Sequence, residues 1–302
     1  MTMPNFLIIG APKAGTTSLY AYLKQHPQIY MPPVKEPHFF ALDNRGVSFQ
    51  GPGDQTRLAS AVHQLETYKN LFTGVKDEIA IGEASTNYLG SRCAPERIKQ
   101  LIPEVKLIAV LRNPIDAAYA SYLHLMRNGD EFIKDFSVAL QAEPERIQKN
   151  WGWQWRYQQR GFYFEALERY FSIFEHRQIK VYLFEDFKDD TDGVLRDIFN
   201  FLGVESSFKS KTASRHNASA MPKSLLMNRL LIKPNILRDA AKILFPQAMR
   251  QNLYHRVRAW NLNNFQKPEM SADSRAYLKQ VFRGDILKLE GLIERDLSAW
   301  LE

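Results

Sequence analysis

The stretch from Gly10 to Ser18 has the residue types and spacing of a phosphate-binding loop. Lys13 lies between two glycines, and three hydroxyl residues follow the second one: Thr16, Thr17 and Ser18. An apolar run precedes the loop and a helix is expected after it, so backbone N–H groups and the positive end of the helix dipole converge there. A Walker A loop has its lysine directly after the second glycine, whereas Gly15 is followed here by Thr16. The loop therefore predicts binding of a phosphate-like group in chemistry other than that of Mg²⁺–ATP.

Arg112 marks a second candidate anion site. It follows the apolar run Val105–Leu111, and its planar guanidinium suits a phosphate group held by two hydrogen bonds. Ser121 lies about two turns into the helix expected after Asn113 and Pro114, where its hydroxyl is placed to complete the same contact. A lone arginine here would more often belong to a surface ion pair. Two anion sites on neighbouring strands instead indicate a ligand with phosphate groups at both ends.

A carboxylate suited to proton transfer lies in the segment 35–40. Glu36 stands between Lys35 and His38, just before Phe39 and Phe40. Burial and neighbouring charges of this kind can set the pKa of a carboxyl group for general-base catalysis. The alternative is an ion-paired glutamate beside two core phenylalanines, and the segment alone does not decide between the two.

Alternating strands and helices must position these side chains. Four apolar runs are expected as buried strands: Phe6–Ile9, Ile79–Ile81, Val105–Leu111 and Ile179–Phe184. Helices are expected over Gly15–Gln25, from Asn113 onward, over Phe164–Phe174 and Gly193–Leu202, and in the periodic stretch Ser271–Leu301. This pattern predicts an α/β fold with a parallel sheet flanked by helices. Ligands bind at the carboxyl ends of such strands, which adds Gly82–Ser85, including Glu83, to the candidate sites.

Composition and charge bound the remaining possibilities. The chain of 302 residues carries a net charge of +7, and a segment at about 205–270 holds twelve Lys/Arg against three acidic residues. That segment suits an anionic ligand or membrane surface, or is a solvated basic face. A single cysteine excludes an intrachain disulfide and a cysteine metal site. With no signal peptide, membrane span or nucleic-acid motif visible, we expect a cytoplasmic enzyme of one domain, residues 1–302, that binds no metal and no nucleic acid.

Together these motifs resemble the nucleotide-dependent sulfotransferases, in particular bacterial members similar to the heparan sulfate sulfotransferase domain. Pro12–Ser18 resembles the 5′-phosphosulfate loop of that family, and Leu111–Pro114 with Ser121 resembles its 3′-phosphate motif. Lys35–Phe40 is similar to the segment that carries the catalytic glutamate. The resemblance spans nearly the whole chain and implies a P-loop-like sulfotransferase fold.

The resemblance also implies a reaction and residue roles. The co-substrate would be 3′-phosphoadenosine 5′-phosphosulfate, and the acceptor a hydroxyl or amine of a carbohydrate or small molecule. Lys13 would neutralise the leaving oxygen, Glu36 would take the acceptor proton, and His38 would orient Glu36 or the acceptor. The loop residues Gly15, Thr16, Thr17 and Ser18 would bind the 5′ end, with Arg112 and Ser121 at the 3′-phosphate. Arg215 is a further candidate donor contact in the basic segment.

One motif departs from the family, and two other functions stay open. Heparan-type relatives often have Glu-Lys-Ser/Thr-Pro where this chain has Glu83-Ala84-Ser85-Thr86, so a second catalytic lysine is absent, although Glu83 could still position a substrate hydroxyl. The first alternative is a P-loop nucleotide kinase-like phosphotransferase, which would need the Walker lysine and an acidic strand end. The second is a basic protein that binds membranes or polyanions, with an interfacial helix around Leu225–Ile232.

Overall fold

The computed structural model describes residues 2–42, 48–212 and 268–302, together with Met249, Tyr254, Arg256, Val257 and Trp260. Arg215 and the interfacial helix expected around Leu225–Ile232 lie outside the described residues. The basic segment at about 205–270 is therefore described mainly at its two ends, 205–212 and 268–270.

Five parallel strands form one sheet in the order β2-β3-β1-β4-β5. Their bounds are β1 (Phe6–Gly10), β2 (Ile29–Tyr30), β3 (Ala80–Ala84), β4 (Lys106–Leu111) and β5 (Ile179–Leu183). The central strand β1 is buried at every residue, as expected for a parallel sheet covered on both faces. The α/β fold with a parallel sheet is thereby confirmed.

Helices fill the connections between the strands. The α-helices are α1 (Thr16–Leu23), α2 (Asp54–Ala59), α3 (Leu65–Asn70), α4 (Ala94–Leu101), α5 (Pro114–Arg127), α6 (Phe136–Gln141), α7 (Glu143–Gln148), α8 (Tyr163–Phe171), α9 (Phe184–Asp189), α10 (Thr191–Leu202) and α14 (Ala272–Ile293). Short 3₁₀ helices are η1 (Phe39–Ala41), η2 (Trp153–Trp155), η3 (Gln159–Gly161), η4 (His176–Gln178) and η5 (Ser298–Leu301). Asn113 caps α5 as expected, because its side chain accepts a hydrogen bond from the Ile115 N–H at 3.0 Å.

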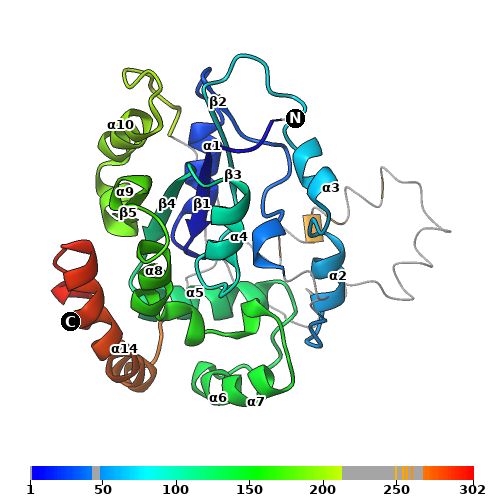
Figure 1. Cartoon of the computed structure of the whole chain (residues 1–302). Coiled ribbons are helices and arrows are strands. Elements are labelled where there is room, and N and C mark those ends of the chain that lie inside the picture. The colour runs from blue at the N-terminus through cyan, green and yellow to red at the C-terminus, as the bar shows by residue number, and fades with distance from the viewer. Residues whose placement is uncertain are drawn as a thin grey trace.

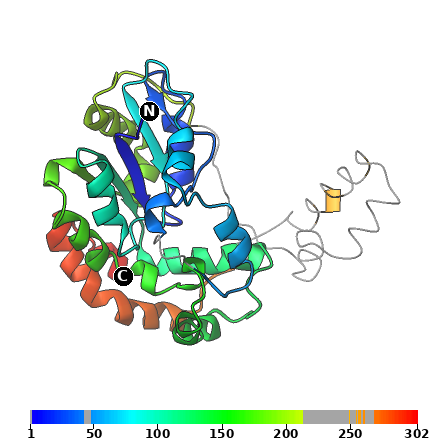
Figure 2. The same ribbon diagram turned by 45° about the vertical axis from the view of Figure 1, so that its right-hand side comes forward.

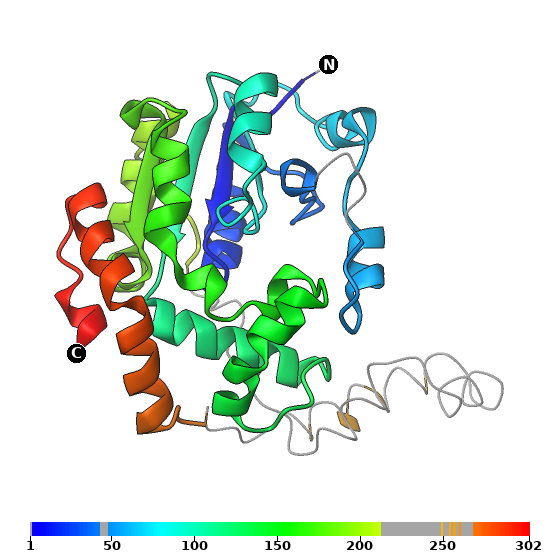
Figure 3. The same ribbon diagram turned by 60° about the horizontal axis from the view of Figure 1, so that its bottom comes forward.

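The direction of the chain reverses at β1, which creates the crevice for a ligand. The connection from β1 leads past the position of β3 to β2 at the edge of the sheet, and the connection from β3 returns past β1 to β4. Right-handed crossovers then place α1 on one face of the sheet and α4 and α8 on the other, as the views from two directions show (Figure 1, Figure 3). The loops after β1 and β4 therefore diverge at the carboxyl edge of the sheet, where doubly wound folds bind their ligands.

Two helices close this edge and support it. Figure 3 shows α5 crossing below the carboxyl ends of the strands. The long helix α14 packs against α8 and α5, and Figure 2 shows it in orange and red along the lower side of the molecule. An ion pair from Arg275 to Asp116, 2.9 Å long, ties α14 to the first turn of α5. The carboxyl edge is thus braced by helices on the side away from β2.

Two element boundaries differ from the sequence expectation. The strand expected over Ile79–Ile81 continues to Ala84, so Glu83 belongs to the sheet rather than to the turn after it. The periodic stretch from Ser271 does not run as one helix to Leu301, because α14 ends at Ile293 with Glu294 in the left-handed region and η5 follows. The two-residue strand β2 was not expected, since so short a run carries no periodicity.

Candidate active site

The loop between β1 and α1 forms a cradle of the expected kind. Gly15, the residue before α1, has a φ of 83°, and an added Cβ would lie 3.2 Å from the ring of Phe184, so glycine is required there. No side chain caps α1, which leaves the N–H groups of its first turn without an intrahelical acceptor. Thr16 begins the helix and is buried, while Thr17 and Ser18 are half-buried. The helix end is therefore open to an anion.

Lys13 lies in this loop with a φ of 66° and carries an unusual pKa. Burial lowers the pKa of Lys13 to about 7, and the positive charges of Arg160 and Arg127 lower it further, while Glu36 opposes them. The ammonium group of Lys13 therefore loses its proton more easily than an ordinary lysine, and a bound anion would raise the pKa again. These couplings also place Lys13, Glu36 and Arg160 within electrostatic reach of one another.

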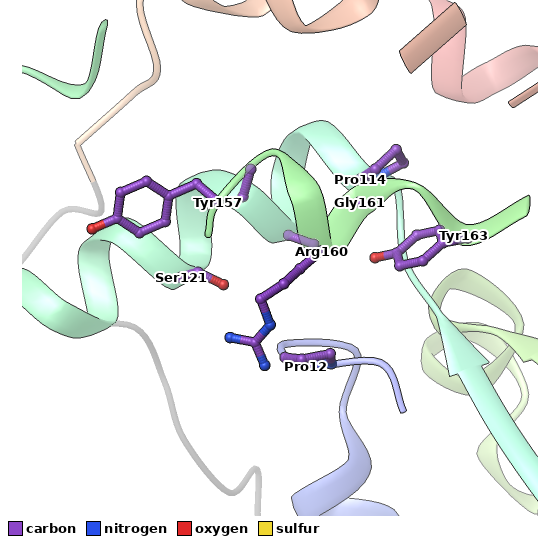
Figure 4. A pocket seen from close by; sticks show the side chains of 9 residues that line it. Pro12, Pro114, Ser121, Tyr157, Arg160, Gly161 and Tyr163 are labelled. Carbon is purple, nitrogen blue, oxygen red and sulfur yellow. The ribbon is translucent and has the colours of Figure 1, made fainter. Parts of the chain in front are cut away.

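Arg112 and Ser121 both lie next to the loop, but they contact different residues. The Arg112 guanidinium donates to the carbonyl of Lys13 at 3.1 Å and lies 4.9 Å from the centre of the Phe184 ring. Ser121 instead lines a pocket with Pro12, Arg160 and Tyr163, together with residues of α5 (Figure 4). Burial raises the pKa of Tyr163, and the charges of Arg112 and Arg160 oppose that rise.

Arg160 is a cation of this site that was not among the residues predicted to bind the donor. Figure 4 shows its side chain reaching from η3 toward Pro12 and Ser121. It donates to the Asn87 side-chain oxygen at 2.9 Å, and burial lowers its pKa to about 10 even though Glu36 raises it. Arg160 lies on η3 and follows neither of the strands that bear the loop motifs, so its position at this edge depends on tertiary packing.

Glu36 is held as an ionised carboxylate at the same edge. The Thr86 N–H donates to its Oε2 at 2.8 Å, the Thr86 hydroxyl lies 3.2 Å from its Oε1, and the Lys35 ammonium lies 2.6 Å from that oxygen. Burial raises the pKa of Glu36, but the charges of Lys35 and His38 and the bonds from Lys35 and Thr86 outweigh it, so the pKa lies below its usual value. Glu36 is therefore a proton acceptor throughout the neutral pH range.

His38 lies beside Glu36 and faces an aromatic side chain. Its Nδ1 is 3.5 Å from the Glu36 Oε2, and burial holds its pKa below the usual value, so the ring is neutral near pH 7. The centre of the Trp153 ring is 5.9 Å from that of His38, and Phe49 packs edge-on against Trp153 at 4.9 Å. The aromatic stretch at 151–157 thus reaches the site through Trp153, whereas Trp155 and Tyr157 are core residues.

Glu83 is not available to a substrate, contrary to the sequence expectation. It is 0% exposed on β3, where the Ser85 hydroxyl donates to its Oε2 at 2.9 Å and the Tyr68 hydroxyl to its Oε1 at 3.1 Å. Burial raises the pKa of Glu83 to about 7, although the hydroxyl groups around it lower the value. The strand continues through Glu83, which turns this side chain inward rather than to the ligand edge.

Because the pKa of Glu83 is raised, we expect the unfolding free energy of the protein to depend on pH, and we expect Glu83→Gln to remove this contribution. The carboxyl titrates near 4.5 when unfolded and near 7 when folded, so the folded state binds the extra proton and stability falls as the pH rises from 4.5 through 7. From pH 5 to pH 8 the variant should gain about 2.5 kcal/mol in unfolding free energy relative to the parent. Urea unfolding at the two pH values measures this difference, and equal losses in both proteins would contradict it.

His124 is another residue of this region that the sequence did not indicate. Burial lowers its pKa to about 3, helped by the charges of Lys13, Arg127, Arg57 and Arg160. It lies on α5 three residues after Ser121, and this helical spacing was the signal that could have found it.

Within residues 2–42, 48–212 and 268–302, no group of three or more His, Cys, Asp or Glu side chains is arranged to hold a metal ion. None of the helices described has the length and apolar character of a membrane span.

Comparison with known proteins identifies the family. A family model described as "Sulfotransferase family" matches residues 4–208. The bifunctional heparan sulfate N-deacetylase/N-sulfotransferase 1 of Mus musculus is 28% identical over 309 residues, which cover 99% of this chain and 31% of that protein. Carbohydrate sulfotransferase 15 of Rattus norvegicus is 25% identical over 257 residues, covering 67% of this chain and 44% of the relative. The chain thus spans about a third of the length of the heparan sulfate relatives.

A solved structure supports the same assignment over the whole chain. The crystal structure of a sulfotransferase from Alicyclobacillus acidocaldarius has 34% sequence identity and a TM-score of 0.80, with 100% of both chains covered. The expected P-loop-like arrangement, a parallel sheet flanked by helices, is therefore confirmed. With a family model over more than half of its length and a full-length structural match, this chain belongs to the sulfotransferase family.

Proposed function

We propose that the chain transfers a sulfuryl group from 3′-phosphoadenosine 5′-phosphosulfate to a hydroxyl or amine of a carbohydrate or small-molecule acceptor. The observation that carries the proposal is the pairing of a half-buried lysine in the loop before the uncapped start of α1 with an ionised carboxylate whose charge acts on it: Glu36 raises the pKa of Lys13 against the effect of burial. A cation for the leaving group and a base for the attacking group are the two charges that this transfer needs.

The β1–α1 loop fits the 5′ end of the donor. When bound, the donor supplies an activated sulfuryl group on a phosphate. The N–H groups of Gly15, Thr16 and Thr17 point from the uncapped start of α1, and the hydroxyls of the first turn, including Ser18, add further donors. Lys13 would neutralise the bridging oxygen as the S–O bond to the phosphate breaks. Its lowered pKa fits this role, because the arriving anion restores the ammonium form.

The 3′-phosphate is assigned to Arg112 and Ser121. Arg112 braces the loop through the Lys13 carbonyl, and the pocket beside Ser121 brings in Arg160. A 3′-phosphate bound between these groups would meet two guanidinium ions and a hydroxyl. Such a set distinguishes a 3′-phosphorylated nucleotide from an ordinary adenine nucleotide.

Glu36 is proposed as the general base. The acceptor O–H or N–H would lose its proton to a Glu36 oxygen while its lone pair forms the new bond to sulfur, and the released phosphate oxygen would keep the electron pair of the broken bond beside Lys13. The neutral ring of His38 would orient the acceptor next to Glu36. No metal ion enters this scheme, because the charges that develop lie next to fixed cationic side chains.

A saccharide is the acceptor class that fits best. The relatives named above include a heparan sulfate N-sulfotransferase and a carbohydrate sulfotransferase. In this chain the partly buried Trp153 lies beside His38, and an indole face packs well against the apolar face of a sugar ring.

Isothermal titration with 3′-phosphoadenosine 5′-phosphate and with ADP tests the donor assignment. We expect the 3′-phosphorylated nucleotide to bind at least tenfold more tightly, because charged hydrogen bonds to the 3′-phosphate add about 1.5–3 kcal/mol. Arg112→Ala should remove most of that preference. Arg177→Ala, which changes an exposed arginine paired with Glu175, is the matched control and should keep it. Equal affinity of the parent for both nucleotides would overturn the assignment.

A further inference from the structure

The segment that carries Glu36 and His38 needs external support. Both residues have positive φ angles, 61° and 57°, which are unfavourable for residues with a Cβ. Three backbone N–H groups fasten the segment to the end of β3 and the residues after it: Glu36 N–H donates to the Ala84 carbonyl at 3.0 Å, His38 N–H to the Ser85 hydroxyl at 3.1 Å, and Phe40 N–H to the Tyr88 hydroxyl at 3.4 Å. Two of the three bonds thus depend on side-chain hydroxyls.

Those two hydroxyls share one further partner, the buried Glu83. The Ser85 hydroxyl donates to its Oε2 at 2.9 Å, and the Tyr88 hydroxyl also hydrogen-bonds to its carboxylate. Tyr68 of α3 donates to the other oxygen and stacks on Phe39, with ring centres 4.4 Å apart. Glu83 is therefore the common acceptor of a hydroxyl cluster that surrounds the base of the Glu36 segment.

The charge state of Glu83 fixes the direction of these hydrogen bonds. An ionised carboxylate only accepts, so the Ser85 and Tyr88 protons point to Glu83 and their oxygen lone pairs remain for the His38 and Phe40 N–H groups. An amide at this position presents an N–H₂ group, which would compete for the same lone pairs. The carboxylate is fully buried and has no contact with solvent, and it hydrogen-bonds to both hydroxyls that accept from the backbone of the Glu36–His38 segment.

We propose that Glu83 is a positioning residue for this reaction, which acts through Ser85 and Tyr88 to hold the Glu36–His38 segment in its productive geometry. The expected effects on the transfer rate rest on the proposed function, whereas the expected effects on hydrogen exchange do not. Misplacement of a catalytic group by about 1 Å can lower a rate by about 100-fold. A residue that acts in this way should change the rate of transfer without changing donor binding, because the donor loop lies on β1 and α1.

The first test is the steady-state rate of Glu83→Gln with the donor and an N-unsubstituted heparan oligosaccharide. We expect kcat to fall about 10- to 100-fold, while the affinity for 3′-phosphoadenosine 5′-phosphate and the KM for the donor stay within twofold. Asp285→Asn is the matched control, since it neutralises another buried carboxylate, one that accepts from the Phe164 N–H at 3.1 Å, and it should leave kcat unchanged. An unchanged kcat in Glu83→Gln would overturn the proposal.

The pH profile separates positioning from general destabilisation. The groups that interact with the Glu83 charge are Tyr68 of α3, Ser85 and Tyr88 after β3, Tyr170 of α8 and the carboxylate of Glu36. Protonation of Glu83 below about pH 7 would turn it into a donor, so kcat of the parent should rise from pH 6 to pH 8. Glu83→Gln cannot titrate at this position, and its profile should stay flat. A rise of equal size in both proteins would contradict the assignment.

Hydrogen exchange tests the coupling without any catalysis. In Glu83→Gln the amides of His38 and Phe40 should exchange at least tenfold faster, while those of β1 and β4 keep the parent rates. Ser85→Ala should accelerate exchange of the His38 amide, and Tyr88→Phe should accelerate exchange of the Phe40 amide. When both substitutions are present, adding Glu83→Gln should accelerate exchange of these amides little further. If Glu83→Gln does not fold, these two variants decide. Unchanged exchange in them overturns the proposal, whereas absence of sulfuryl transfer in the parent, with coupled exchange intact, overturns only the proposed function.

Discussion

Replacing Glu36 by Gln is expected to lower kcat by roughly two to four orders of magnitude, the range for loss of a positioned general base. The amide keeps an oxygen for the Thr86 N–H, which donates to Oε2 at 2.8 Å in the parent, so the segment should retain its geometry. The variant lacks the carboxylate that takes up the proton from the hydroxyl or amine of the acceptor substrate. Binding of 3′-phosphoadenosine 5′-phosphate should be unchanged or slightly tighter, because a negative charge near the phosphate site is removed.

Single-turnover transfer of labelled sulfate, with nucleotide titration in parallel, measures these two effects. Glu175→Gln is the matched control, since Glu175 forms an exposed ion pair with Arg177 and should affect neither quantity. Because the pKa of Glu36 lies below its usual value, any loss of activity caused by protonation of Glu36 should occur at a lower pH than for an ordinary glutamate. Full turnover in Glu36→Gln would remove the general-base assignment.

Replacing Lys13 by Met is the second change with a large expected effect, a loss of about 100- to 1000-fold in kcat. Met has a side chain of similar length without the charge, so the variant isolates the stabilisation of the leaving oxygen, for which removal of a single donor typically has an effect of this size. Lys13→Arg should recover part of the activity, since its charge persists at all relevant pH values.

The pH dependence gives this prediction a sign. Burial lowers the pKa of Lys13 to about 7, so the free protein loses the ammonium above that pH and kcat/KM for the donor should fall tenfold per unit there. Bound anion restores the charge, so binding of 3′-phosphoadenosine 5′-phosphate at pH 8 should take up close to one proton. Titration in buffers of different ionisation enthalpy measures that proton. Uptake that persists in Lys13→Met would contradict the assignment.

The candidate site residues that the sequence indicates are those that follow a strand. Lys13 and Arg112 could be found because an apolar run precedes each of them and a helix start follows. Arg160 and Trp153 stand out in the sequence only as parts of a family-like motif and of an aromatic run, since they lie on 3₁₀ turns whose place beside the sheet is decided by tertiary packing. The sequence predicts a strand end at Ile81, three residues before β3 ends at Ala84, because a pattern of period two does not define where a strand stops; the expectation that Glu83 faces a substrate was therefore wrong.

The hydrogen bond from Arg112 to the Lys13 carbonyl has a consequence for inhibitor design. It joins the turn after β4 to the turn after β1, so we expect the two proposed anion sites to respond to a ligand together. We expect a fragment that orders one turn to order the other as well. A second fragment would then bind with a smaller loss of conformational entropy. Linked compounds that reach both turns should gain more affinity than the separate fragments would suggest, and screening at saturating concentrations of one fragment is the efficient way to find the other.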